Sequence, residues 1–200
     1  TEYYNIMPVW EWDKIPGTTT RDYQGDLELK EQWGDPASNK FAGGVSNGNT
    51  GTTAMSVDYD GISAKKAWFF FDKEIVCLGA GITSSAKEPV VTTLNQTWLN
   101  GPVRWNGKTT MEGDSLQRQV KPGEYLTHNN VLYYFPGPAK ISLTTKEQYG
   151  SWYRINRSRA KDIVHGKVFK FWIDHAVAPS NANYAYIVVP GTKQLDQKAM

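Results

Sequence analysis

Apolar residues are concentrated between residues 64 and 82, where two short apolar runs flank a polar pair. Residues 67–71 read Ala-Trp-Phe-Phe-Phe, and residues 74–78 form a second run with β-branched side chains. The pair at 72–73, Asp-Lys, has the length that closes a tight β-hairpin. Because a strand that is apolar at every position is covered on both faces, the pattern predicts a central hairpin beneath a second layer. The side chains expected in its core are Trp68, Phe70 and Ile75.

The rest of the chain predicts about ten strands and no long helix. Pro16-Gly17 is typical of a turn that needs a positive φ at glycine, and Leu27–Trp33 predicts one short helical turn. An Asn-Asn turn is expected inside Tyr125–Phe135. Further strands are expected at 89–98, 139–145, 168–175 and 184–189, and strand-like residues also begin the chain at 3–7. Many short strands without helices indicate an all-β fold of packed antiparallel sheets, a β-sandwich.

The stretch from Met7 to Thr20 alternates aromatic and acidic residues before its turn. As a strand it would place Trp10 and Trp12 on one face and Glu11 and Asp13 on the other. Two carboxylates on one face suit glycoside hydrolysis if a sugar groove faces them at the right separation. The alternative is a core-facing tryptophan pair with solvated acids, and the residues alone leave both interpretations open.

Composition excludes some partners and favours others. The chain has 200 residues with a formal net charge of +2, too small to indicate nucleic acid or an anionic membrane as a partner. Its 8 Trp and 11 Tyr suit either a core or stacking on sugar rings, because these side chains combine a flat apolar face with a polar group. The single cysteine, Cys77, lies in the predicted hairpin, and we expect it to be a small buried apolar residue.

Familiar catalytic motifs are absent from the sequence. It has no phosphate-binding glycine loop before a helix, no Cys-x-x-Cys, no His-Glu-x-x-His and no Gly-x-Ser-x-Gly. Its three histidines are far apart along the chain. One set of oxygen-bearing residues has a composition that a hard cation such as calcium accepts, although such residues are also ordinary in hairpin turns. This set comprises Asn47, Asn49, Asp58 and Tyr59.

Several ordered blocks resemble polysaccharide lyase family 8, which includes chondroitin AC, hyaluronate and xanthan lyases, and the likeness is greatest to bacterial chondroitin AC lyases. The blocks are MPVWEWDKIPGTTT (7–20), FAGGVS (41–46), AKKAWFFFDKEIVCLGAGI (64–82), TTLNQTW (92–98), VLYYFP (131–136) and FWIDHAVAPSNANYAYIVVP (171–190). They run over nearly the whole chain.

This resemblance implies a large antiparallel supersandwich of the galactose mutarotase-like type. Residues 1–200 would be the central domain of a larger secreted or periplasmic bacterial enzyme, whose N-terminal helical toroid and C-terminal β domain lie outside this chain. Such enzymes cleave uronate-containing polysaccharides, chondroitin or hyaluronan, by β-elimination. The family's catalytic Tyr, His, Arg and Asn lie mainly on the helical domain, which would be this chain's partner together with the anionic polysaccharide.

The resemblance also implies roles for residues in the first block. Glu11, with Asp13 second, matches an auxiliary acidic residue that orients the catalytic groups, and three nearby side chains would contact the sugar. These are Trp10, Trp12 and Arg21. Some members bind calcium in this domain, which suggests the 47, 49, 58, 59 set as its ligands.

Two other functions fit the residues. One is a sandwich that binds carbohydrate without catalysis. The other is a mutarotase-like enzyme using His128 or His175 with Glu11.

Overall fold

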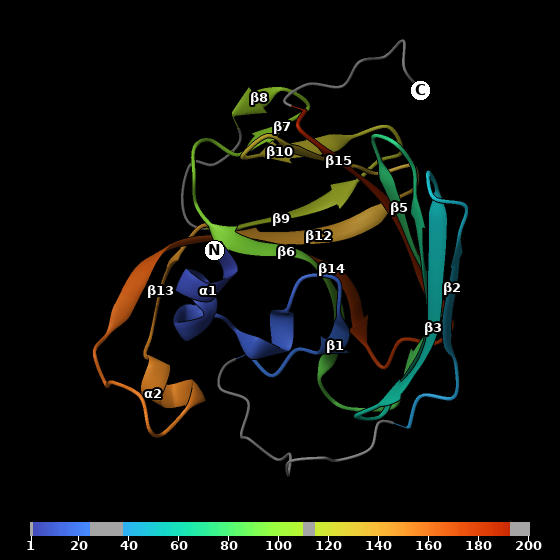
Figure 1. The fold of residues 1–200 in the computed structure, drawn as a ribbon. Coiled ribbons are helices and arrows are strands. Elements are labelled where there is room, and N and C mark those ends of the chain that lie inside the picture. Colours follow the sequence, from blue (N-terminus) through green and yellow to red (C-terminus); the bar gives the residue numbers. More distant parts are fainter. Residues whose placement is uncertain (1, 25–37, 110–114, 193–200) are drawn as a thin grey trace.

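Two antiparallel sheets pack face to face in the computed structural model, which describes residues 2–24, 38–109 and 115–192 (Figure 1). The six-stranded sheet has the order β1 (Thr19–Arg21), β6 (Pro89–Trp98), β14 (Val164–Val177), β12 (Ala139–Thr144) and β9 (Ser115–Val120), and β13 (Glu147–Gly150) also pairs with β14. The nine-stranded sheet has the order β2 (Ala42–Ser46), β3 (Gly51–Tyr59), β4 (Ile62–Phe70), β5 (Ile75–Ser84), β15 (Ala182–Pro190), β11 (Val131–Tyr134), β10 (Tyr125–His128), β7 (Arg104–Trp105) and β8 (Lys108–Thr109). The predicted all-β sandwich is confirmed.

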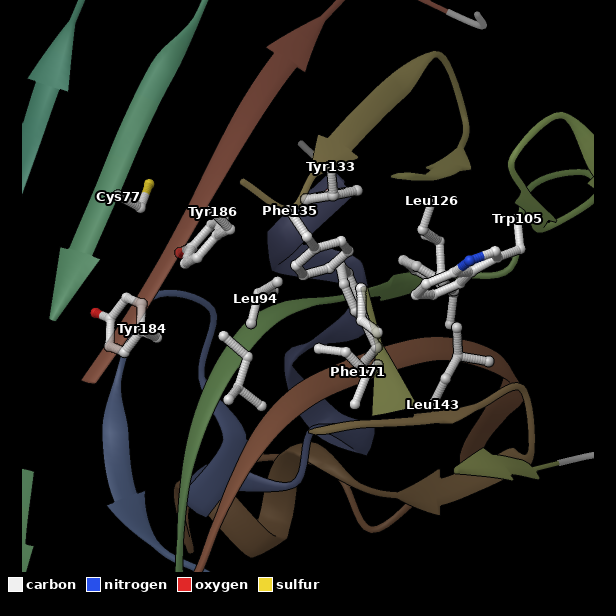
Figure 2. Packing of buried hydrophobic residues seen from close by; sticks show 14 of the residues in the cluster. Cys77, Leu94, Trp105, Leu126, Tyr133, Phe135, Leu143, Phe171, Tyr184 and Tyr186 are labelled. Atoms are coloured by element: carbon white, nitrogen blue, oxygen red, sulfur yellow. The ribbon is translucent and has the colours of Figure 1, made fainter. Parts of the chain in front are cut away.

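The main core lies between the sheets and takes residues from both. Figure 2 shows it extending from Tyr184 and Tyr186 at one end to Trp105 at the other. Phe135 is fully buried, and its ring stacks on Trp105 with centroids 5.9 Å apart. Cys77 is buried in this core, as predicted.

Both predicted turns form as expected. The Thr18 N–H donates to the Ile15 carbonyl at 3.1 Å, and Gly17 has a φ of +81°. Asn129 and Asn130 both have positive φ between β10 and β11. The helical turn predicted at 27–33 falls outside the described residues.

The central hairpin forms as β4 and β5, but its core was predicted only in part. Trp68 and Ile75 pack against the main core while remaining partly exposed. Phe70 is 39% exposed and Phe71 is exposed as well. Phe70 shares the inward phase of β4 with the buried Ile62 and ends the strand. Cover from the opposite sheet therefore declines along β4, and a continuous apolar run did not mean continuous burial.

Residues 2–14 form an N-terminal segment of short helical turns and pair with no strand, so the strands predicted at 3–7 and 10–13 are wrong. The chain begins with α1 (Glu2–Ile6), then two 3₁₀ turns, η1 (Met7–Val9) and η2 (Trp12–Lys14). Pro8 lies at the start of η1, where a missing N–H costs nothing, and would be poorly tolerated in a central strand.

This N-terminal segment covers the outer face of the six-stranded sheet. A second core cluster of Ile6, Val9, Trp10 and Val168 joins it to β14. Gly150 of β13 allows close approach, because a Cβ there would lie 1.7 Å from the Pro8 carbonyl oxygen.

A β-bulge in β6 anchors the segment by turning Gln96 outward. Leu94 has no counterpart on β14, where Phe171 pairs with Asn95 and Trp172 with Thr93. The extra residue reverses the alternation, so Leu94 faces the main core and Gln96 faces the N-terminal segment. The fully buried Gln96 amide accepts from the Glu11 N–H at 2.9 Å and donates to the carbonyls of Glu11 at 3.1 Å and Lys14 at 2.8 Å.

Lys66 of β4 is buried inside the sandwich without an acidic partner. Its ammonium donates to the Gly17 carbonyl and lies 5.4 Å from the Trp68 ring centroid and 6.0 Å from that of Tyr184. Among the described residues, no carboxylate lies within ion-pair distance of it. Burial lowers the pKa of Lys66 to about 8.

Truncation of Phe135 and of Phe70 distinguishes the observed core from the predicted one. Phe135→Ala is expected to lower the free energy of unfolding by about 3–5 kcal/mol, because it leaves a cavity in a fully buried site. Phe70→Ala should cost much less, since its side chain is half exposed. Urea denaturation of both variants measures the difference, and equal losses would contradict this placement of the core.

Replacement of Gln96 tests the anchoring of the N-terminal segment. Gln96→Leu keeps a similar volume but leaves the Glu11 N–H and the Lys14 carbonyl without their partner, while the Glu11 carbonyl keeps the Lys14 N–H, so we expect a loss of roughly 2–4 kcal/mol of stability. Gln117→Leu, at an exposed position of β9, is the matched control and should change stability little. A near-neutral Gln96→Leu in thermal or urea unfolding would refute the anchor.

Lys66→Met tests the buried ammonium through pH. The unfolded chain, with a lysine pKa near 10.5, binds more protons than the folded one between about pH 8 and 10.5. The parent's free energy of unfolding should therefore gain about 3 kcal/mol from this group as the pH rises through that window. The variant should lack this gain and be the more stable protein below pH 8. Identical pH dependence in the two proteins would exclude the assignment.

Candidate functional site

A cleft of about 630 Å³ lies on the outer face of the six-stranded sheet, beside the N-terminal segment. Its floor includes Lys170, Trp172 and Asp174 of β14, which alternate with the core residues at 169, 171 and 173. One wall is formed by residues 9–11 and 14, and the other by β13. Strand alternation thus gives β14 an apolar inner face and a polar, accessible outer face.

Glu11 is held in this cleft between two buried lysines. Lys170 donates to Glu11 Oε1, and Lys14 Nζ lies 3.2 Å from Glu11 Oε2. The lysine side chains are only 3–4% exposed, whereas that of Glu11 is 34% exposed. The 3₁₀ turn of η2 makes the Lys14–Glu11 pair possible, because residues three apart lie on the same side of such a turn. Each carboxylate oxygen therefore has its own ammonium partner, and we call this arrangement the Glu11 clamp.

The clamp is embedded in further polar contacts that hold its lysines. Lys14 also donates to Asp22 Oδ1 at 2.7 Å and to Asp13 Oδ2 at 3.3 Å, and Lys170 donates to Gln148 Oε1 at 3.1 Å. Burial opposes ionisation of Glu11, but the charges of Lys170 and Lys14 outweigh it and lower the pKa of Glu11 below its ordinary value. Glu11 is therefore a fixed anionic hydrogen-bond acceptor at neutral pH rather than a proton donor.

Asp13, predicted to share a face with Glu11, does not reach the cleft. It is fully buried, and its Oδ2 accepts from the Tyr23 N–H at 3.0 Å as well as from Lys14. Burial raises the pKa of Asp13. The strand on which the carboxylate pair was predicted is a 3₁₀ turn instead, which rotates the two side chains apart. Asp13 therefore ties residues 13 and 23 together and is not accessible to a substrate.

The three predicted sugar contacts are placed differently from one another. Trp10 lines the cleft but is largely buried, and its ring meets Trp12 edge to face with centroids 5.7 Å apart. Trp12 packs against the second core cluster. Arg21 is ion-paired with Glu88 at 2.5 Å and Asp60 at 3.0 Å and does not line the cleft. Of these three residues, only Trp10 lines the cleft together with Glu11.

Sequence reasoning missed Lys170 and Trp172. Trp172 lies beneath the clamp, with its ring centroid 5.4 Å from Lys14 Nζ and 5.7 Å from Lys170 Nζ. A lysine between two phenylalanines in an otherwise apolar strand was the available signal, because such a charge needs a partner.

The four residues suggested as calcium ligands do not come together. Asn47 lies in the β2–β3 turn, where its side-chain oxygen accepts from the N–H groups of Asn49 at 3.0 Å and Thr50 at 2.8 Å. Asp58 and Tyr59 end β3, whose nine residues span roughly 26 Å at about 3.3 Å per residue. One ion cannot bind at both ends. Among the described residues, no group of three or more His, Cys, Asp or Glu side chains is arranged to hold a metal.

The histidines of the mutarotase-like alternative do not meet Glu11. His128 stacks on the core residue Phe169 at 4.1 Å, and its Nε2 accepts from the Asn100 N–H. His175 Nε2 bonds to Thr92 Oγ1 at 2.8 Å on the core side of the six-stranded sheet. Glu11 lies on the opposite, outer face, so this predicted arrangement is wrong.

In the described residues, 2–24, 38–109 and 115–192, no helix is both long enough and apolar enough to span a bilayer.

Comparison with known proteins agrees with the observed fold. Residues 1–199 match the family model described as polysaccharide lyase family 8, super-sandwich domain. The chain is 56% identical over 196 residues to the chondroitinase-AC of Pedobacter heparinus, covering 98% of this chain and 28% of that protein. A solved chondroitinase AC lyase superposes with a TM-score of 0.93 at 56% identity, over 98% of this chain and 29% of that one. The xanthan lyase of a Bacillus species is 32% identical, over 93% of this chain and 21% of that enzyme.

The chain therefore spans less than a third of the length of these relatives. The family model covers almost all of it, and the observed sandwich agrees with that match. By these findings the chain belongs to polysaccharide lyase family 8, as its super-sandwich domain.

Proposed function

We propose that this chain is the sandwich domain of a glycosaminoglycan lyase that cleaves chondroitin or hyaluronan by β-elimination. The observation that supports this most is the Glu11 clamp, set in a polar cleft of a chain 56% identical to a chondroitinase-AC. A hyaluronate lyase of Thermasporomyces composti, 32% identical over 192 residues, supports the same class of uronate-containing substrate.

The chemistry of β-elimination defines what the clamp contributes. A base must remove the proton at C5 of the uronate, a positive or hydrogen-bonding group must stabilise the charge that develops, and an acid must protonate the leaving oxygen. An ionised Glu11 cannot act as the acid, and it would repel rather than neutralise the uronate carboxylate. It can accept hydrogen bonds from donor groups and hold them in position. Glu11 is thus a positioning residue in this proposal.

The remaining catalytic groups come from another part of the enzyme in this proposal. Among the described residues that line the cleft there is no histidine, and the one tyrosine, Tyr149, is hydrogen-bonded to Glu147 at its rim. The resemblance described above assigns the base and acid to an N-terminal helical domain. The cleft would then be one wall of a groove completed by that domain, in an enzyme secreted or exported to the periplasm, where such polymers are met.

The cleft surface suits a saccharide. Its floor and walls present hydroxyl and amide groups of Gln117, Ser142 and Thr144 beside the ionic groups. Such groups both donate and accept hydrogen bonds, as sugar hydroxyls require.

Ultraviolet absorbance of the unsaturated uronate product tests the proposal. Chondroitin sulfate and hyaluronan are incubated with the full-length parent and with this chain alone. Absorbance should rise with the parent and not with the chain. In the parent, Glu11→Gln should lower kcat by roughly a hundredfold, because a misplaced catalytic group costs about that much. Asp72→Asn, in the β4–β5 turn, is the matched control and should leave kcat unchanged.

Two results would contradict the proposal. Cleavage by the chain alone would show that this sandwich holds a complete catalytic site. No cleavage by the parent, with saccharide still bound, would favour the alternative of a non-catalytic carbohydrate-binding sandwich.

A further inference from the structure

Residues 146–167 form a strongly basic excursion that we call the basic lobe. It comprises β13, the short helix α2 (Trp152–Ile155), the connection that follows and the start of β14. The lobe contains six Lys or Arg and two acidic residues, a formal charge of +4, whereas the whole chain carries only +2. In Figure 1, β13 pairs with the start of β14 and, together with α2, extends beyond the other strands of the six-stranded sheet. Positive charge is therefore concentrated on one projection, and the rest of the chain is slightly acidic.

The charges of the basic lobe are largely available to a ligand. Five of the six basic side chains are exposed, and in the described parts of the chain none of these five is ion-paired with a carboxylate. They are Lys146, Arg157, Arg159, Lys161 and Lys167.

Aromatic contacts give the basic lobe a defined shape. Arg157 and Lys161 lie on the Tyr153 ring, 4.9 and 4.8 Å from its centroid. Tyr149 stacks on His165 with centroids 5.4 Å apart and remains 60% exposed. Arg157 and Lys161 are thus held against a ring, which lowers the entropy lost when a ligand binds these two cations.

The basic lobe borders the cleft directly. Lys146, Tyr149 and Arg154 belong to the lobe and also line the cleft. The cleft itself has no net charge, because its four basic residues (Lys14, Lys146, Arg154 and Lys170) are matched by four acidic ones (Glu11, Asp22, Glu147 and Asp174). The cleft alone thus offers an anionic polymer no net attraction. The lobe residues that do not line the cleft add a formal charge of +3 at its rim, from Arg157, Arg159, Lys161 and Lys167 against Asp162.

We propose that the basic lobe is a binding subsite for the anionic polysaccharide. The lobe binds the carboxylate or sulfate groups on the part of the polymer that extends beyond the cleft. This inference rests on the proposed function for the identity of the polymer. Positive side chains attract a polyanion over about a Debye length, roughly 10 Å at 0.1 M salt, so the effect is on capture and depends on ionic strength. The lobe contributes to substrate affinity and not to the chemical step.

A charge-neutralising triple variant of the full-length parent tests the subsite. Arg157→Gln, Arg159→Gln and Lys161→Gln together should raise KM for polymeric chondroitin sulfate roughly tenfold at low salt and leave kcat unchanged. The effect should shrink as salt is added and be absent for an oligosaccharide too short to leave the cleft. The matched control neutralises three exposed lysines outside the lobe, Lys73, Lys108 and Lys121, and should keep the parent's KM.

A second variant separates charge from structure. Arg157→Lys, Arg159→Lys and Lys161→Arg keep the charges and should restore the parent's KM. An unchanged KM in the neutralised triple would overturn the proposal. If the unfolding temperature of that triple also falls, the lobe is instead a packing surface for another part of the enzyme.

Retention of the parent on immobilised polysaccharide distinguishes failure of this proposal from failure of the proposed function, because binding needs no cleavage. If the parent has no lyase activity but its retention depends on the lobe, the proposed subsite is supported and the proposed lyase function is contradicted. If the parent cleaves the polymer but its retention does not depend on the lobe, the lyase function is supported and the subsite is contradicted. Hyaluronan, which carries only carboxylates, and chondroitin sulfate, which also carries sulfates, show which group the lobe binds.

Discussion

Two buried lysines, and the partly exposed glutamate that joins them on the outer face of the six-stranded sheet, impose the main constraint on this structure. A lysine removed from water is costly unless a carboxylate and further hydrogen bonds compensate it. Lys14 and Lys170 satisfy this requirement jointly through Glu11. Because one lysine comes from the N-terminal segment and the other from β14, the segment must be held in register with the strand. Loss of Glu11 would leave Lys170 without an ion-pair partner in the described part of the chain, whereas Lys14 would keep Asp13 and Asp22.

The surrounding features follow from that requirement. The bulge at Leu94 turns Gln96 outward, and its amide binds backbone groups on both sides of η2. Gln148 of β13 donates to the Val9 carbonyl at 2.6 Å and accepts from Lys170. The N-terminal segment is therefore fixed by side chains from β6 and β13, rather than by pairing as a strand. A segment of helical turns thus sits rigidly on a sheet, and the partly exposed Glu11 carboxylate has a defined orientation.

Outside the N-terminal segment, local patterns predicted the strands and turns well, since these depend on neighbours in sequence. Asn129-Asn130 and Pro16-Gly17 specify their turns by the backbone angles they tolerate. Burial of Phe70 could not be predicted, because it depends on how far the opposite sheet extends. The same limit applies to Asp13 and Gln96, whose directions follow from a 3₁₀ turn and a bulge that leave little trace in the sequence. Glu11 was found through family resemblance, whereas its partner Lys170, 159 residues away in the chain, was not.

The position of Cys77 has a consequence for observing motions of this fold. It is the single thiol of the chain, it is 4% exposed, and burial raises its pKa. A reagent in water can reach such a sulfur only when β5 separates from the strands around it. The rate of Cys77 alkylation under native conditions therefore counts spontaneous openings of the sandwich. It would also show, without any added label, whether a bound polysaccharide makes those openings rarer.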